Sequence, residues 1–390
     1  MASKSRLALG LLAGLAATPG LASDLVGPQA QAETEASAAI YPNIKIEGSA
    51  ELQFDRMLPT NDPSARVSSA FITIEPEITA NLSEQFRLFA HLLYEPVADP
   101  DSGEMQWLRN EGFFAEELYA QTTLGDFDVS LGKVDPMFGV ASDEAPGIYG
   151  KDFAASYDYR GALGGGVNWH LASRQTTGFD GGAATLNQSL GIYAFSADTS
   201  FLSRSLFVDR GQLDLSDGGL GNTDSPSSFS IAYSVKTVDA KDELSGPAAQ
   251  LAVRHLAAGT DGGNDEWGLL ASGQDIFGLG DDVTLKTLAE LAYFVHEGGG
   301  DANALTATAG AEIQQGPWIA SLTAAVHKPF GGDGGADSLI TTSFGREFEF
   351  ESAGTFRVDV AYAHSKTDGE IANTFGFRLH KDFAWSSSAE

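Results

Sequence analysis

Cysteine is absent from the 390-residue chain, and basic residues are scarce. The absence of thiols excludes disulfides, zinc–thiolate sites and a cysteine nucleophile. The 23 Lys and Arg residues stand against 53 Asp and Glu residues, which gives a formal net charge of -30. This balance argues against DNA or RNA as a partner, because nucleic acids are bound by basic surfaces.

Beyond its N-terminus the chain lacks any run of about twenty apolar residues, so no membrane helix is predicted there. At the N-terminus, Lys4 and Arg6 precede the apolar run LALGLLAGLAA, and small residues follow. This layout is typical of a secretory signal peptide, cleaved after AQA at 30–32 or, as the alternative, after LAS at 21–23. An uncleaved anchor is disfavoured because the run is short for a span. We predict a signal peptide over residues 1–32.

Alternation of apolar and polar side chains is what the rest of the chain has instead. In LGDFDVSLGKVDPMFG, residues 124–139, the apolar Phe127, Val129 and Leu131 are separated by single polar residues. This pattern predicts a strand with one apolar and one polar face. The segments that share the pattern, about sixteen in all, are 43–54, 68–80, 84–95, 113–124, 126–134, 159–171, 184–196, 227–236, 248–257, 266–276, 282–296, 303–314, 317–328, 338–350, 355–365 and 370–385.

The connections between these segments alternate between short and long. The long ones are 55–67, 96–112, 135–158 and 197–226, and they follow odd-numbered segments. Two connections after even-numbered segments, 172–183 and 237–247, are longer than this rule allows. A membrane-spanning barrel has short turns at one end and long loops at the other, and crosses the bilayer without apolar helices. We predict an all-β fold, a transmembrane antiparallel β-barrel of about 16 strands, with 14 or 18 as alternative counts.

Aromatic side chains fall near the two ends of the predicted strands, as expected for girdles at the two membrane interfaces. The ends with short connections carry Trp169, Trp318, Phe350, Phe356, Phe383 and Trp385, and the ends with long connections carry Phe54, Phe71, Tyr94, Phe229 and Trp267. The apolar face that includes Phe127 and Leu131 is therefore expected to face lipid, and the other face a polar interior.

With these features the chain resembles Gram-negative outer-membrane porins of the sixteen-stranded class, general or substrate-specific. The signal peptide, the amphipathic strands, the last strand with Phe383 and Trp385, and the run GKVDPMFG at 132–139 carry the resemblance. It implies a multi-pass protein of the bacterial outer membrane, in contact with lipid and lipopolysaccharide, that forms a homotrimer and lets small hydrophilic solutes and ions diffuse through. The expected parts are the signal peptide at 1–32, a short periplasmic leader at 33–42, the barrel at 43–385 and a tail at 386–390.

By the same resemblance, the connection 135–158 is the loop that folds inward and narrows the pore. It is long, rich in glycine and proline, and acidic, which is typical of a functional loop. Its charged residues are Asp135, Asp143, Glu144, Lys151, Asp152 and Asp158. A mobile lid outside the barrel is the alternative.

Charged residues on the predicted inward faces form the candidate pore wall. They include Arg87, Glu117, Asp128, Lys133, Arg160, Arg254, Lys286, Glu290 and Arg378. Because acidic residues exceed basic ones on these faces, we expect a preference for cations. Two alternatives remain: the charges pair locally, or Arg87, Lys133 and Arg160 form a basic ladder facing the acidic loop.

Other functions receive less support from the residues. A channel specific for a sugar, a phosphate or an iron chelate would need a lumenal row of aromatics or arginines, for which Phe89, Tyr119 and Phe294 are few. A plugged structural or adhesive barrel is a further alternative. No Ser–His pairing or His metal motif predicts an enzyme or a cofactor. The Gly/Asp clusters at 259–265, 297–302 and 331–337 lack calcium-loop spacing and indicate flexible turns, with loose Ca²⁺ or Mg²⁺ binding as the alternative.

Overall fold

The computed structural model describes most of the chain after the expected signal peptide. The described residues are 41–59, 66–98, 100, 103–280, 282–331, 335–351 and 353–387. They belong to one unit, Tyr41–Glu390. The expected signal peptide at 1–32, all but the last two residues of the leader, and the last three residues of the tail lie outside them. Among the described residues, no helix is long and apolar enough to span a membrane.

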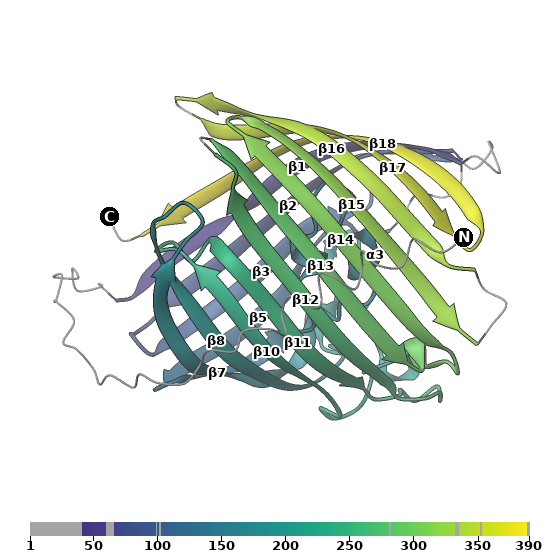
Figure 1. Cartoon of the computed structure of the whole chain (residues 1–390). Helices are drawn as coiled ribbons and strands as arrows, with labels where there is room; N and C mark the ends of the chain where they lie inside the picture. The colour runs from purple at the N-terminus through teal and green to yellow at the C-terminus, as the bar shows by residue number, and fades with distance from the viewer. Residues whose placement is uncertain are drawn as a thin grey trace, which may run out of the picture. The chain divides into compact units, whose positions relative to one another are not determined.

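In the described part of the chain, 16 antiparallel strands close into a barrel (Figure 1). The strands are β1 (Asn43–Pro59), β2 (Val67–Asn81), β3 (Phe86–Pro96), β5 (Glu111–Leu124), β6 (Phe127–Val134), β7 (Ala162–Thr177), β8 (Ala183–Ser196), β10 (Ser228–Val238), β11 (Leu244–Leu256), β12 (Glu266–Gly278), β13 (Val283–Val295), β14 (Asn303–Gln315), β15 (Trp318–Phe330), β16 (Asp337–Phe350), β17 (Gly354–Thr367) and β18 (Glu370–Ser386). The sheet closes where β1 pairs with both β2 and β18. The predicted fold class and all the predicted strands are confirmed.

Two very short strands sit beside the barrel wall. β4 (Met105–Trp107) pairs in parallel with the start of β2, and β9 (Leu206–Phe207) pairs with the start of β5. Both come from long connections, and the ring of Trp107 lies 5.4 Å from that of Phe54 on β1. These loop segments therefore extend the wall at the end of the barrel that carries the long connections, which we call the loop end; the opposite end is the turn end.

The two connections that seemed too long are in fact short turns. β7 continues to Thr177 and β10 to Val238, so only 178–182 and 239–243 remain as turns. β7 has 16 residues, and at roughly 3.3 Å per residue and a tilt of about 45° it rises about 37 Å, more than an apolar band of about 25 Å. Strand ends beyond that band can be polar on both faces, which hides them from the alternation pattern.

The outer surface of the barrel is apolar where the alternation predicts it. Leu131 is 71% exposed and Phe127 41% exposed on the outside, where the Phe127 and Trp169 rings stack at 5.6 Å. On the inside, Asp128 accepts a hydrogen bond from Thr123 at 2.6 Å. The prediction for Phe71 is wrong, because this ring lines a cavity inside the barrel.

Residues 135–158 lie inside the barrel rather than over its mouth. Two short helices, α2 (Ala141–Glu144) and α3 (Asp152–Ala155), form within this segment, and Figure 1 labels α3. α2 contacts β13, and α3 contacts β14 and β15. Phe138 and Tyr157 of the segment pack with Phe294 of β13 in a buried cluster. The loop thus occupies the lumen with its own small hydrophobic core against one side of the wall.

Candidate functional site

Glu290 on β13 is the main anchor of the lumenal loop, which we call the inner loop (135–158). Its carboxylate accepts hydrogen bonds from the backbone N–H groups of Val140 at 2.7 Å and Ala141 at 3.3 Å. The hydroxyl of Tyr157 donates to the same carboxylate. A buried carboxylate that accepts three hydrogen bonds from the loop holds the loop in place and has no free position for a solute. Glu290 was predicted as pore wall, and its place in the structure is beneath the loop.

Arg254 on β11 holds the returning end of the inner loop. It is 2% exposed, donates to the backbone oxygen of Tyr157 at 2.5 Å and pairs with Glu266 at 3.0 Å. Its guanidinium also lies 4.3 Å from the centre of the Phe138 ring, within cation–π distance. Arg254 was likewise predicted as pore wall, yet it is covered by the loop that it fixes.

The tip of the inner loop reaches the opposite side of the barrel. Thr323 of β15 donates to the backbone oxygen of Pro146 at 2.8 Å. Further on, the hydroxyl of Tyr149 donates to Asp55 of β1 at 2.5 Å. Gly376 on β18 makes room for this contact, since a Cβ there would lie 2.2 Å from the Tyr149 hydroxyl oxygen. The inner loop therefore crosses the lumen from β13 to β1.

Three charged residues of the inner loop lie on its solvent-facing side. Asp143, Glu144 and Lys151 are exposed, and Asp143 pairs with Arg160 at 2.6 Å. Arg160 also binds Asp158, at 2.5 Å.

A β-bulge in β5 brings two successive carboxylates to the inner wall beside the start of the inner loop. The β3–β5 register shifts at His91/Leu92, and His91 contacts Glu116 at 3.1 Å. Glu117 accepts the backbone N–H of Asp135 at 3.0 Å. A regular strand would turn adjacent side chains to opposite faces. Glu117 was predicted for the wall; Glu116 was missed, because no signal in the sequence reveals the bulge.

The basic residues predicted for the wall do not form one ladder. Arg87 donates to Gln121 at 2.9 Å near the turn end. Lys133 is 3% exposed and pairs with Asp198 at 2.9 Å under the connection that contains β9. Lys286 is exposed and shares the inward face of β13 with Glu290. The ladder alternative therefore has no geometric counterpart among the described residues.

A dense charge network covers the wall formed by β14, β17, β18 and β1. Asp359, which is fully buried, contacts Arg357 at 2.8 Å and Arg378 at 3.1 Å. Arg378 also reaches Glu51 at 3.2 Å, and Glu51 contacts His380 at 2.8 Å. We call this set the wall network. Every member has a partner of opposite charge, so its formal charges largely cancel within the wall.

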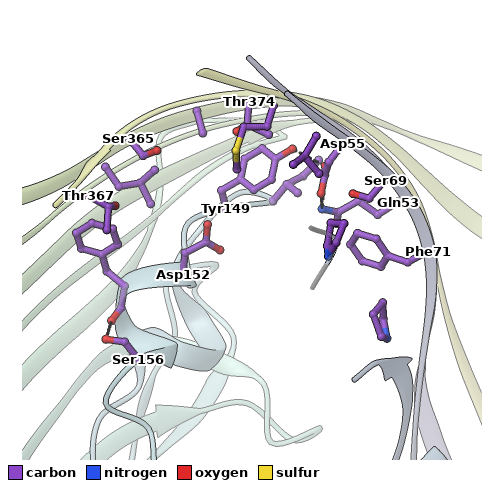
Figure 2. Close-up of a pocket in the computed structure, with 18 of the residues that line it drawn as sticks. Gln53, Asp55, Ser69, Phe71, Tyr149, Asp152, Ser156, Ser365, Thr367 and Thr374 are labelled. Carbon is purple, nitrogen blue, oxygen red and sulfur yellow. Dashed lines mark hydrogen bonds between the residues drawn. The ribbon is translucent and has the colours of Figure 1, made fainter. Parts of the chain in front are cut away.

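The inner loop leaves cavities around it instead of filling the barrel. One, of about 930 Å³, lies at the loop end between the loop and β1–β3 and β15–β18, and we call it the loop-end cavity. A second, of about 200 Å³, lies toward the turn end beside Arg87, Glu117, Tyr119 and Asp128. A third, of about 470 Å³, lies beside Lys133 and Arg160. Figure 2 shows part of the loop-end cavity, with Tyr149 between Asp55 and Asp152.

Protonation of the inner-loop carboxyls is altered by their surroundings. The enclosed lumen desolvates Asp152 and raises its pKa to about 7, and the nearby charge of Asp55 adds to the shift. Burial, then the charges of Glu117 and Glu116, raises the pKa of Asp135 well above its usual range.

In the first Gly/Asp cluster, 259–265, two carboxylates cap backbone N–H groups of neighbouring loop residues. Asp261 accepts the N–H of Gly219 at 3.0 Å, and Asp265 accepts the N–H of Ala258 at 2.8 Å. Part of the third cluster, 332–334, lies outside the described residues. Within the described ranges, no group of three or more His, Asp or Glu side chains is arranged to hold a metal ion.

Comparison with known proteins identifies the fold. No family model and no curated protein matches the sequence. Among solved structures, DcaP, an outer-membrane channel of Acinetobacter baumannii, has a TM-score of 0.53 at 11% identity, with 88% of this chain and 99% of that one covered. OpdK of Pseudomonas aeruginosa, solved with vanillate, has a TM-score of 0.50 at 10% identity, with 88% and 99% covered. The chain therefore has the fold of outer-membrane channels of the porin type.

Proposed function

We propose that this protein is a diffusion channel of the bacterial outer membrane for small hydrophilic solutes and ions. The observation that carries the proposal is the inner loop, which crosses the lumen on fixed anchors at Glu290 and Asp55 and leaves water-sized space on both sides. A loop that narrows a lumen without filling it is what a size-selective pore requires. The loop end then faces the exterior and the turn end the periplasm.

The channel should prefer cations. The loop-end cavity is lined by five carboxyls, of Asp55, Glu95, Asp152, Glu297 and Asp337, with His327 as the one basic side chain among the described lining residues. The basic residues of the wall network are already paired. An excess of one sign along a narrow passage raises the local concentration of the opposite ion.

A solute-specific channel is the second candidate, because the OpdK structure contains vanillate. Vanillate is an aromatic carboxylate, and the acidic lining of the loop-end cavity opposes an anion. Specificity for a cationic solute fits this lining better. Assembly as a homotrimer, with lipid and lipopolysaccharide around it, is part of the proposal, and native mass spectrometry of the detergent-extracted protein would test the stoichiometry.

Single-channel recording tests the proposal directly. The purified mature protein, reconstituted in a planar bilayer under a KCl gradient, should give stable conductance steps and a cation-selective reversal potential. Anion selectivity would keep the channel and overturn the charge argument. A folded, heat-modifiable barrel that gives no steps would contradict the channel and favour a plugged structural or adhesive barrel.

A further inference from the structure

The loop-end cavity has features of a binding site as well as of a passage. Its volume of about 930 Å³ falls in the range of sites for small organic molecules, about 300–1,000 Å³. The described residues that line it include no lysine or arginine. His327, the one basic side chain, lies 3.5 Å from Glu297 and is bonded to Thr306 at 3.0 Å. The cavity is therefore anionic, with no internal cation to neutralise its remaining carboxyls.

Asp152 and Asp55 form the acidic centre of this cavity. Asp55 accepts hydrogen bonds from Tyr149 at 2.5 Å and from Gln53 at 2.9 Å, which fix its orientation. The side-chain carboxylate of Asp152, at the start of α3, accepts no hydrogen bond and forms no ion pair with any described residue. The negative charge of Asp55 is close enough to act on it. Two like charges held near each other without a cation favour a positively charged guest. Figure 2 shows both side chains beside Tyr149.

Gln106 is an independent sign of an absent partner. This residue of β4 lines the cavity and is 4% exposed. Its Nε2 donates to the backbone oxygen of Arg109 at 2.8 Å, which sets the orientation of the amide. Its Oε1 is buried and accepts no hydrogen bond from the described residues. A buried acceptor without a donor costs free energy, and a guest with an N–H or O–H group would remove that cost.

Apolar and aromatic surfaces complete the lining. Phe71 of β2 and Phe153 of α3 line the cavity together with Tyr149. The serine and threonine hydroxyls between them include Ser69, Thr73, Ser156, Ser365, Thr367 and Thr374. Aromatic faces attract cations as well as the apolar part of a guest. The lining thus combines a negative centre with surfaces for an organic body.

We propose that the loop-end cavity is a binding subsite for small organic ammonium ions that carry an aromatic or apolar body. The ammonium group pairs with Asp152 and Asp55, the body packs on Phe71 and Phe153, and a further donor on the guest satisfies Gln106. This inference rests on the proposed channel function and names the solute class that the channel favours. A guest held there would occupy the path above the inner loop and reduce the ionic current while bound.

Current block tests this subsite with three probes of matched shape. Phenylethylammonium, neutral phenylethanol and anionic phenylacetate are added in turn to the wild-type channel. The ammonium should halve the K⁺ current at a concentration at least about tenfold below that of the other two. Asp152→Asn should raise that concentration by about tenfold, and Asp152→Glu should restore block. Asp224→Asn is the matched control, because it removes an exposed carboxyl of the connection 197–226 away from the cavity. The ammonium ion should block this variant at the same concentration as the wild-type channel.

The outcomes separate the two proposals. No conductance from folded wild-type protein contradicts the channel itself. If all three probes block the conducting channel equally, the proposed subsite is contradicted, while the channel function stands. The same conclusion follows if the ammonium ion blocks the Asp152→Asn and Asp224→Asn channels at the same concentration. If phenylacetate blocks more strongly than phenylethylammonium, the subsite favours anions, which contradicts the proposed positive charge of its guest.

Discussion

The wall network and the loop-end cavity handle charge in opposite ways. In the wall network, the buried Asp359 lies between Arg357 and Arg378, and Glu51 lies between Arg378 and His380. In the loop-end cavity, the described lining contains five carboxyls and no lysine or arginine. Asp359 is fully buried, whereas the carboxyls of the loop-end cavity line open space, so the two regions differ in access to water.

This difference separates charges that hold the barrel from charges that meet solutes. Buried ions are tolerated when opposite charges and hydrogen bonds compensate their desolvation. Carboxyls without such partners persist only where water or a visiting cation solvates them. We infer that the wall network stabilises the barrel, and that the carboxyls of the loop-end cavity interact with the ions and solutes that pass through it. Each prediction below removes one side of this contrast.

Breaking the wall network should have the largest effect. Asp359→Asn removes the buried carboxylate that pairs with both Arg357 and Arg378. Removing one partner of a buried ion pair typically costs about 3–5 kcal/mol. Urea unfolding of the barrel in detergent micelles should show a loss of this size.

Asp382→Asn is the matched control for this loss. It removes a carboxyl of the neighbouring β18 whose side chain is 83% exposed and which binds only the edge of the network, through His380. Its unfolding free energy should change by less than about 1 kcal/mol, as for exposed ion pairs. Equal losses in the two variants would show that burial of Asp359 is not what matters.

Loosening the inner loop should have the next largest effect. Glu290→Gln weakens the contacts to Val140, Ala141 and Tyr157, and hydrogen bonds to a charged group are worth about 1.5–3 kcal/mol each. We expect larger open-channel current noise and faster proteolysis within 135–158. Thr323→Val removes one neutral hydrogen bond to Pro146 and should change both readouts less. If the Glu290→Gln channel shows wild-type current noise and wild-type resistance to proteolysis, Glu290 does not anchor the inner loop.

Much of this architecture could be predicted from alternation, and the limits of that pattern are physical. Period-two alternation assigns Phe127 and Leu131 to the outer face, because it depends on a single strand. The expectation of an aromatic girdle fails at Phe71, because alternation places this ring on the same inward face as Thr73, where both line a cavity. The alternation itself stops short at Thr177 and Val238, where the strands extend without an apolar outer face.

Contacts between distant segments were beyond prediction for a different reason. The pair Glu51–Arg378 joins β1 to β18 across the closure of the barrel, and only the inter-strand register brings the two residues together. Glu116 depends on a bulge, and Lys133 is covered because the connection after β8 brings Asp198 onto it. Residue type and spacing carry no information about the path of such a loop.

Neutralising the exposed acids of the inner loop should have a smaller effect. The double variant Asp143→Asn/Glu144→Gln removes charge from the solvent-facing side of the loop. The ratio of K⁺ to Cl⁻ permeability should fall by about twofold at 0.01 M salt and by less at 1 M, since the Debye length shrinks from about 30 Å to about 3 Å. The control Asp242→Asn, in a turn-end connection, should not alter the ratio. A salt-independent fall would contradict an electrostatic origin.

A pH titration should give the smallest effect and sharpens the contrast further. Desolvation inside the enclosed lumen and the charge of Asp55 raise the pKa of Asp152 to about 7. A carboxyl is neutral below its pKa and charged above it, so the loop-end cavity gains negative charge as the pH rises through about 7. The reversal potential under a KCl gradient should become more cation-selective from pH 6 to pH 8, and Asp152→Asn should make this step smaller. An unchanged step in Asp152→Asn would assign the titration to another group, because the amide has no proton to lose.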